Sequence, residues 1–279
     1  MTTEHRLLPR LVAVDLDGTF LNQDSLVTRA NLHAVKELNA MGIEFVVTSG
    51  RILPRFPQDV LSLEEMRFAI TANGASLIDL QENKELFSDP LPKETAAQVV
   101  DAVTSFPIYF EIYVENQAYT DEKALCFYSD SFYSPNRLKA MNQSKNIISD
   151  IQELLQRDCR IQKIFLPHVE KEYIRAFEEK LVSIKGVEIT NPFPYHYEFT
   201  KQGCNKANCL RQLCNRLDIL PKDIMAFGDA NNDSAMLRFA GMSVAMGNAD
   251  EEIRKQARFT AKSNAEDGVA QFLQQYVLQ

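Results

Sequence analysis

The chain has no long uncharged apolar run, so we expect no transmembrane helix. Its N-terminus, MTTEHRLLPRLVAV, lacks the uninterrupted apolar stretch and the small-residue cleavage site of a signal peptide, which makes the cytoplasm the expected location. Basic residues are in deficit, because 30 Lys and Arg stand against 38 Asp and Glu, a formal net charge of −8. Nucleic-acid binders neutralise phosphates with a basic surface, so this deficit argues against nucleic acid as the main partner.

The five cysteines are odd in number, and their positions do not resemble a disulfide framework. Paired C-x-x-C spacings are also absent, which argues against a zinc site. Cys204, Cys209 and Cys214 recur every five residues, a spacing that places them on different faces of a helix. We therefore expect reduced, partly buried thiols.

Domain linkers rich in Gly and Ser, internal repeats and low-complexity tracts are missing as well. What is present is the composition of an ordinary globular protein, with 45% hydrophobic and 24% charged residues. A length of 279 residues suggests one large domain or two modest ones.

Short apolar runs alternate with helical patterns in the first and last parts of the chain. Strands are predicted over 11–16, 43–51, 67–80 (two strands joined at 73–74), 224–229 and 242–247. Helices are predicted over 28–42, with Thr28 as N-cap and Gly42 as stop, and over 205–219, 231–241 and 250–257. This rhythm indicates an α/β fold with a parallel sheet covered by helices on both faces.

Between these parts the pattern changes to that of an α+β unit. Helices are predicted over 93–103, 150–159 and 171–186, a solvated antiparallel strand pair over 108–120 and a strand over 161–167. We therefore predict a discontinuous core, 1–86 and 194–279, interrupted by an inserted α+β domain, 87–193.

Polar residues follow three of the predicted strands and begin one of the predicted helices. Asp15, Asp17 and Gly18 follow the first strand, and Ser49 and Gly50 follow the second. Lys206 begins a helix, and the stretch GDANND (228–233) follows a later strand. Each stretch alone is compatible with an ordinary turn, cap or solvated lysine.

Taken together, the four stretches predict a ligand site, because ligands of open α/β sheets bind outside the carboxyl ends of the strands. Two carboxylates about 4 Å apart repel each other by roughly 4 kcal/mol at an effective dielectric constant of about 20, so the cluster needs a cation. Oxygen ligands on loops favour Mg²⁺, completed by water and a substrate phosphate.

These motifs resemble those of the haloacid dehalogenase superfamily, specifically Cof-type phosphatases with a large α+β cap. The matches are DLDGT (15–19), TSGR (48–51), Lys206 and GDANND (228–233), with NGA (73–75), VAMGNA (244–249) and SNAEDGVA (263–270) as secondary matches. The resemblance implies a Rossmann-like core with the cap inserted between the second and third motifs. The departures are small: Ala207 stands where glycine is frequent, Ser49 where threonine is common and Lys201 where proline is frequent.

The resemblance also implies a role for each acidic residue. Asp15 resembles the nucleophile that forms an aspartyl-phosphate, and Asp17 resembles the general acid and base. Mg²⁺ would be bound by Asp15, the backbone carbonyl of Asp17 and Asp229, while Asp233 would support the metal or orient the lysine.

The phosphoryl oxygens would be held by Ser49 with the backbone around Gly50, by Lys206 and by Asn232. One residue apart along an extended chain, Asp15 and Asp17 are expected to point the same way. Leu16 is then expected to face the core.

The favoured function is a Mg²⁺-dependent phosphatase acting on a small phosphorylated metabolite such as a sugar phosphate, a nucleotide or a phosphorylated cofactor. A hexose phosphomutase or other phosphotransferase remains an alternative, and so does a non-catalytic regulator that binds a phosphorylated ligand. Nothing in the sequence indicates a membrane or an obligate protein partner.

The cap is expected to contact the leaving group, with Tyr109, Glu111 and Tyr113 as candidates. Ordinary sheet packing explains the alternation of these three residues equally well. His168 and His196 are expected to be structural, because the implied mechanism has no need of histidine.

Overall fold

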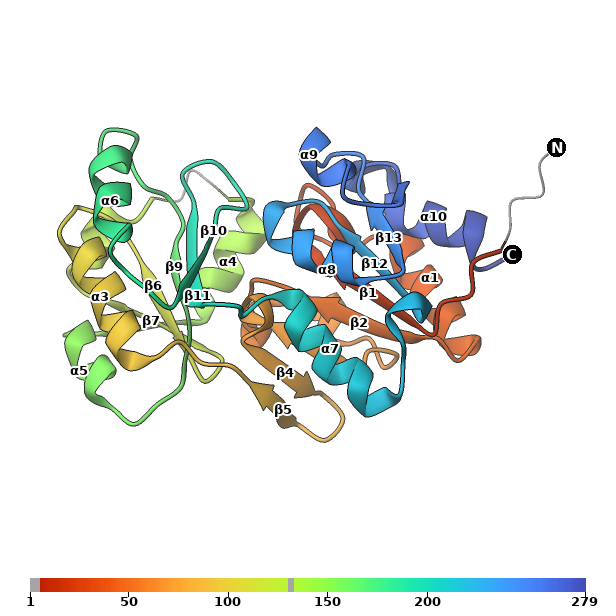
Figure 1. Ribbon diagram of the computed structural model, residues 1–279, viewed down its shortest axis with the longest axis horizontal. Coiled ribbons are helices and arrows are strands. Elements are labelled where there is room, and N and C mark those ends of the chain that lie inside the picture. Colours follow the sequence, from red (N-terminus) through yellow and green to blue (C-terminus); the bar gives the residue numbers. More distant parts are fainter. Residues whose placement is uncertain (1–5, 130–132) are drawn as a thin grey trace.

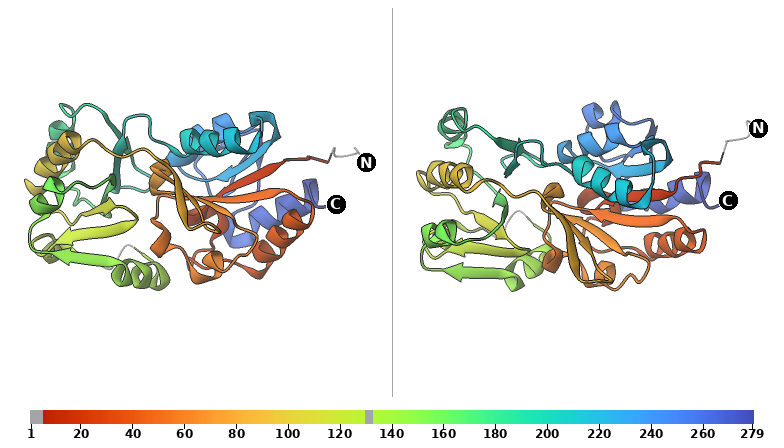
Figure 2. Two further views of the ribbon diagram at one scale, coloured as in Figure 1. Left: turned by 90° about the horizontal axis from the view of Figure 1, so that it is seen from below. Right: turned by 60° about the horizontal axis from the view of Figure 1, so that its bottom comes forward.

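The computed structural model describes residues 6–129 and 133–279, which form two lobes, each built around its own β-sheet (Figure 1). The larger lobe contains both ends of the described chain, and the smaller lobe contains its middle (Figure 2). We call them the core and the cap. Among the described residues, no helix combines the length and the apolar character that crossing a membrane requires.

The core sheet has eight strands in the order β14-β13-β12-β1-β2-β3-β4-β5. Strands β1 to β3 and β12 to β14 run parallel, while β4 and β5 are antiparallel additions at one edge. Their bounds are β1 (Leu11–Asp15), β2 (Glu44–Thr48), β3 (Phe68–Thr71), β4 (Ser76–Asp79), β5 (Lys84–Ser88), β12 (Ile224–Gly228), β13 (Met242–Ala245) and β14 (Phe259–Thr260).

Helices cover both faces of this sheet, as the sequence predicts. Two of them pack on one face, α1 (Arg29–Ala40) and α10 (Gly268–Tyr276), and two on the other, α7 (Lys206–Leu217) and α8 (Ser234–Phe239). The short helices α2 (Gln58–Leu61) and α9 (Glu251–Arg254) complete the core.

The predicted cap at the start of α1 is confirmed, because the Thr28 side chain accepts a hydrogen bond from the backbone N–H of Asn31. The predicted stop is confirmed too, because Gly42 follows the helix with φ of +72°.

The cap sheet has six strands in the order β10-β11-β9-β6-β7-β8, antiparallel except for the pair β7 and β8. Its strands are β6 (Glu111–Val114), β7 (Gln117–Asp121), β8 (Lys145–Ile148), β9 (Ile161–Leu166), β10 (Val187–Thr190) and β11 (Tyr197–Lys201). Helices α3 (Lys93–Thr104), α5 (Ile151–Gln156) and α6 (Ile174–Leu181) pack on one face. Helix α4 (Pro135–Gln143) also belongs to the cap, and it lies on the side of the cap that is turned toward the core (Figure 1).

The prediction of a solvated strand pair over 108–120 is wrong for β6. The pair is antiparallel, but every residue of β6 is buried. Helices cover one face of the strand, and the other face meets the core through a cluster that joins Tyr113 and Phe165 of the cap to Ile52 and Ala72 of the core.

The domain boundaries stay a prediction, and strand pairing bears on one of them. Strand β11 pairs with β9 and β10 in the cap sheet, although it lies beyond residue 193. If the cap is defined by the strands of its sheet, it would therefore end after Lys201 rather than at residue 193.

All five cysteines are free, and Cys204, Cys209 and Cys214 are buried, as expected. Burial raises the pKa of each of these three thiols, so they pack as neutral side chains.

Candidate active site

The carboxyl ends of three adjacent strands form the site. Strand β1 pairs with β2 on one side and with β12 on the other, so the segments that follow these strands meet at one edge of the sheet. All five residues of β1 are buried, and Asp15 ends it. The chain then places Leu16 in the hydrophobic core, as predicted, before a single wide turn over Leu16–Phe20.

Gly18 lets this turn approach the strand next to it. Its φ of +81° lies in the left-handed region, which side chains disfavour. A Cβ atom on Gly18 would lie 2.2 Å from Oδ2 of Asp229, so there is no room for one. Thr19 in the same turn donates a hydrogen bond to Oδ1 of Asp229 (2.8 Å), which fixes the position of that carboxylate.

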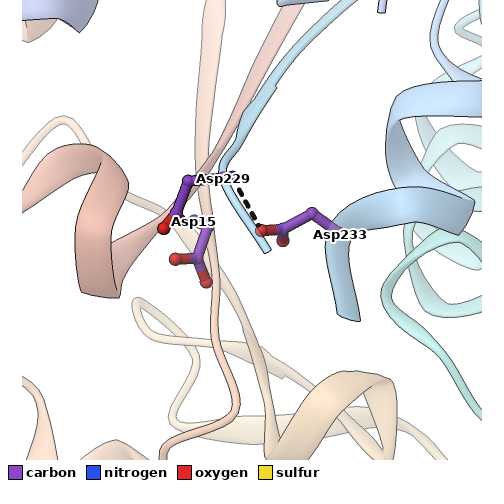
Figure 3. Close-up of side chains that lie close together, drawn as sticks. All are labelled: Asp15, Asp229 and Asp233. Carbon is purple, nitrogen blue, oxygen red and sulfur yellow. Dashed lines mark hydrogen bonds between the residues drawn. The ribbon is translucent and has the colours of Figure 1, made fainter. Parts of the chain in front are cut away.

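Three carboxylates converge at this edge, from Asp15, Asp229 and Asp233 (Figure 3). Each offers an oxygen atom that lies within 4.8 Å of the other two. Oδ2 of Asp233 accepts a hydrogen bond from the backbone N–H of Asp229 (3.0 Å), which holds the loop after β12 in place. Lys206 is fully buried at the start of α7, and its Nζ lies 2.5 Å from Oδ1 of Asp15 and 2.6 Å from Oδ1 of Asp233.

Electrostatics in this cluster show a shortage of positive charge. Burial raises the pKa of Asp15 well above its usual range, Lys206 acts in the opposite direction, and the neighbouring carboxylates of Asp233 and Asp229 add to the increase. Burial together with Asp233 raises the pKa of Asp229 to about 7. The pKa of Lys206 is raised, because Asp15 and Asp233 outweigh the effect of burial.

The residues fit a divalent metal ion. Three carboxylates against one ammonium leave a formal excess of two negative charges, which a dication would cancel. Carboxylate oxygens are also the ligands that Mg²⁺ prefers. The acidic cluster can therefore hold a magnesium ion.

Asp17 lies in different surroundings from Asp15, although both line the same cavity. Arg51 donates two hydrogen bonds to its carboxylate, from Nε to Oδ2 (2.8 Å) and from Nη2 to Oδ1 (2.5 Å). Nη1 of Arg137, a residue of the cap, lies 3.3 Å from Oδ1. Burial acts to raise the pKa of Asp17, but the charges of Arg137 and Arg51 outweigh it and hold the pKa well below its usual range.

The structure places Ser49 and Gly50 directly after β2. The buried hydroxyl oxygen of Ser49 accepts a hydrogen bond from the backbone N–H of Arg51 (3.1 Å). Gly50 lines the cavity, whereas Ser49 does not. The carbonyl oxygen of Gly50 accepts a hydrogen bond from Nζ of Lys163 (2.5 Å), a lysine of the cap sheet.

Asn232 lines the cavity and begins a chain of hydrogen bonds from the core into the cap. It donates to Oδ1 of Asn73 (3.3 Å), Asn73 donates to Oε2 of Glu198 (2.5 Å), and Lys163 donates to Oε1 of Glu198 (2.6 Å). Burial acts to raise the pKa of Glu198, but Lys163 and His196 outweigh it and lower that pKa.

Of the three candidate cap residues, Tyr113 lines the cavity, whereas Tyr109 and Glu111 do not. Glu111 instead pairs with Arg55 of the core, whose Nη1 lies 2.6 Å from its Oε2. Tyr109 donates a hydrogen bond to Oε1 of Glu111 (2.7 Å), and Arg55 also donates to the hydroxyl of Tyr113 (2.7 Å). Arg55 thus extends from the core into the cap.

The two histidines differ. His168 is partly exposed, with Nε2 3.7 Å from a carboxylate oxygen of Glu170. His196 is buried, lines the cavity beside Glu198, and has a lowered pKa because of burial. Its position on the cavity wall was not anticipated.

Four cations around the cavity were not predicted: Arg51, Arg55, Arg137 and Lys163. Two of them could have been identified from the sequence. Arg51 belongs to the TSGR motif, and a lysine such as Lys163 is unusual inside an apolar strand such as IQKIFL. Arg55 and Arg137 lie in stretches with no local pattern that would single them out.

The cavity between the core and the cap has a volume of about 40 Å³, room for a few water molecules. A groove of about 390 Å³ lies beside it and also reaches Asp17. Four residues line both hollows: Asp17, Arg137, Phe193 and His196.

Comparison with known proteins supplies a context for this geometry. A sequence model of haloacid dehalogenase-like hydrolases matches residues 12–273. The chain is 30% identical over 274 residues to the 5-amino-6-(5-phospho-D-ribitylamino)uracil phosphatase YcsE of Bacillus subtilis, covering 96% of both proteins. It is 24% identical over 273 residues to the pyridoxal phosphate phosphatase YbhA of Escherichia coli, covering 96% of this chain and 99% of that protein.

A solved structure agrees with the fold. A haloacid dehalogenase-like hydrolase from B. subtilis superposes with a TM-score of 0.81 at 28% identity, over 95% of this chain and 99% of that one. The similarity therefore includes both the core and the cap.

Proposed function

This chain belongs to the family of haloacid dehalogenase-like hydrolases, and from that premise we propose that it is a Mg²⁺-dependent phosphatase that acts through an aspartyl-phosphate. One observation carries the proposal. Asp15 lies at the carboxyl end of β1 with the ammonium of Lys206 2.5 Å from Oδ1, and with Asp229 and Asp233 beside it. A carboxylate that is to attack a phosphate dianion needs compensating positive charge, which Lys206 supplies and which a metal ion held by the carboxylates would add.

The substrate would be a small phosphorylated metabolite. Two similar proteins are named for phosphorylated compounds of this kind, one for a ribitylaminouracil phosphate and one for pyridoxal phosphate. For this chain we keep the broader class of sugar phosphates, nucleotides and phosphorylated cofactors.

In the first step, an oxygen of Asp15 would attack phosphorus while the bond between phosphorus and the leaving oxygen breaks. The leaving oxygen would take a proton from the carboxyl group of Asp17. In the second step, water would attack the phosphorus of the aspartyl-phosphate, Asp17 would accept its proton, and phosphate would leave with Asp15 regenerated. Splitting the reaction in this way replaces one difficult step by two easier ones.

Mg²⁺ would be held by Asp15, Asp229 and the backbone carbonyl of Asp17, with Asp233 supporting the site. When bound, it would neutralise charge on the phosphoryl group and on the carboxylates around it. The buried ammonium of Lys206 would hold a phosphoryl oxygen from the other side, next to Asp233. Burial would strengthen the attraction between this ammonium and the phosphoryl oxygen, because little water is present to screen it.

Ser49, the backbone around Gly50 and Asn232 would hold the remaining phosphoryl oxygens. Gly50 and Asn232 line the cavity, which supports this role. Ser49 does not line the cavity, and its hydroxyl oxygen accepts a hydrogen bond from the backbone N–H of Arg51.

Asp17 would need its proton in the first step and its carboxylate form in the second. Arg51 and Arg137 favour the carboxylate in the present structure. A bound phosphoryl dianion is a like charge, and a like charge nearby raises the pKa of a carboxyl group. Substrate binding would thus move Asp17 toward the form that can donate.

The cap would have to open to admit the substrate. A cavity of about 40 Å³ is far smaller than the roughly 300–1,000 Å³ of ordinary ligand sites. The inserted cap, predicted as residues 87–193, would then close over the phosphoryl group and exclude water from the first step.

The test is release of inorganic phosphate from a panel of phosphorylated sugars, nucleotides and cofactors, with Mg²⁺ and with EDTA. We expect release to stop in EDTA, to return with excess Mg²⁺, and to fall at least about a thousandfold in Asp15→Asn. Cys159→Ser, at a partly exposed cap cysteine away from the site, is the matched control and should retain activity. Full turnover by Asp15→Asn would rule out Asp15 as the nucleophile. Isomerisation of a sugar phosphate without net phosphate release would instead indicate a phosphomutase.

A further inference from the structure

Arg137 is a mostly buried arginine that makes an ion pair with Asp17. Its side chain is 14% exposed, and its ionic contact is the 3.3 Å approach to Asp17. Over residues 6–129 and 133–279, its guanidinium donates no hydrogen bond. Arg51 already supplies one N–H to each oxygen of Asp17, so that carboxylate does not need a second arginine. Buried polar groups are normally paired, so the N–H groups of Arg137 that make no hydrogen bond among the described residues are available to a ligand.

Aromatic rings hold the guanidinium in place without using its N–H groups. Its central carbon lies 4.4 Å from the ring centre of Tyr133 and 5.9 Å from that of Phe193. Such contacts engage the flat face of the group and leave its edge free for hydrogen bonds.

The position of Arg137 connects it to the leaving group of a substrate. It lines both the cavity beside the nucleophile and the groove of about 390 Å³ outside it. The groove has the size of an ordinary ligand site, whereas the cavity does not. A phosphate ester with its phosphoryl group at Asp15 would extend past Asp17 toward the groove, and so past Arg137.

The cations around this part of the cavity do not each have a separate carboxylate partner. Arg55 pairs with Glu111, and Lys163 pairs with Glu198, each at 2.6 Å. Arg137 instead shares the carboxylate of Asp17 with Arg51. The three cations interact, because the pKa of Lys163 is lowered by burial and further by the charges of Arg137 and Arg55. Nη2 of Arg55 is also buried with no partner in the part of the chain that the structure describes.

We propose that Arg137 determines specificity for a second anionic group on the leaving part of the substrate, a carboxylate or a further phosphate. This inference rests on the proposed phosphatase function. The guanidinium edge matches either anion with two parallel hydrogen bonds. Nη2 of Arg55, which has no partner among the described residues, offers a further donor in the same cavity.

The experiment compares esters that differ in that anion. Sorbitol 6-phosphate and 6-phosphogluconate differ in a terminal hydroxymethyl or carboxylate, and fructose 6-phosphate and fructose 1,6-bisphosphate differ in a second phosphate. We expect the wild-type enzyme to favour the more anionic member of at least one pair by about tenfold or more in kcat/KM, the order expected of charge-assisted hydrogen bonds. The pair that shows the preference identifies the anion.

Arg137→Met should reduce that preference to near unity, because it keeps an unbranched side chain and much of the volume while removing the charge and the N–H donors. Arg175→Met is the matched control, since Arg175 also belongs to the cap but is 93% exposed and lines neither hollow. It should keep the wild-type preference. If Arg137→Met does not fold, Arg137→Lys serves in its place, and the preference should fall at least threefold as the paired hydrogen bonds are lost.

Two results would overturn the inference: a wild-type enzyme without preference in either pair, or an equal loss on both members in Arg137→Met. The second result would show that Arg137 serves the transferred phosphoryl group. If the wild-type enzyme hydrolyses neither these esters nor any member of the wider panel, the proposed function fails by itself. Binding of the same pairs to Asp15→Asn, measured by calorimetry, then still decides the role of Arg137.

Discussion

Replacing Arg55 by Met is expected to destabilise the protein strongly, because it strands a buried carboxylate. Arg55 is 3% exposed, its partner Glu111 is fully buried, and the two lie 2.6 Å apart. Once Arg55 is lost, Glu111 keeps the hydrogen bond from Tyr109 (2.7 Å) and no cation at hydrogen-bonding distance among the described residues. Arg55 also donates to Ser144 (2.8 Å), so one substitution removes several contacts between the core and the cap.

The expected cost follows from this burial. Breaking a buried ion pair from one side costs about 3–5 kcal/mol, because the remaining charge is neither hydrated nor paired. At about 2 °C per kcal/mol for a chain of this length, Tm should fall by about 6–10 °C. Methionine fills much of the volume of arginine, so little of this change should come from a cavity.

Thermal unfolding followed by circular dichroism measures the effect. The matched control is Arg175→Met, whose ion pair with Glu179 is exposed on both sides and contributes about 0.2–0.5 kcal/mol. The double variant Arg55→Met, Glu111→Leu should recover part of the lost stability, because it no longer buries a lone charge. A decrease of less than 2 °C in Arg55→Met, roughly 1 kcal/mol, would refute this account, as would a double variant less stable than the single one.

Three further predictions concern the site and its scaffold. Gly18→Ala should cost about 1–3 kcal/mol and reduce phosphate release, because φ is +81° and the new Cβ would meet Asp229; unchanged unfolding and activity would contradict this. Mg²⁺ added after EDTA should raise Tm, by an amount corresponding to about 2.7 kcal/mol at a hundred times Kd, and less in Asp229→Asn; equal shifts would argue against the metal site. The pKa of Asp79 is lowered, since hydrogen bonds from Arg67 outweigh burial, so Asp79 stabilises the fold above pH of about 4, and this contribution is lost as pH falls. Urea midpoints between pH 6 and pH 3 should therefore fall less steeply in Asp79→Asn than in the wild type.

The sequence predicts those parts of the fold whose apolar pattern is strong. The fully buried strands β1 and β12 are continuous apolar runs, and α7 has a clear apolar face. Elements with a weak apolar pattern were not predicted. Strand β5 is partly exposed along its length, and α4 buries Met141 alone, so neither presents the periodic apolar face that burial imposes.

Candidate site residues that follow strands were predictable for a topological reason. Parallel strands end at one edge, so the residues after β1, β2 and β12 must meet whatever lies between them in the chain. Arg137 and Arg55 obey no such rule, because their place depends on how the cap packs on the core. Such packing is a long-range property that no local pattern records.

Asp15 and Asp17 are one residue apart, yet the fold gives them different electrostatic surroundings. The charged neighbours that hold Asp15 come from the core, from α7 and the loop after β12, and its pKa is raised. Asp17 also interacts with the charge of Arg137, which belongs to the cap, and the pKa of Asp17 is lowered. Movement of the cap therefore changes the surroundings of the proposed acid and base much more than those of the proposed nucleophile. Because α4 carries Arg137, a substitution that shifts this helix can alter proton transfer while leaving Asp15 and Lys206 as they are.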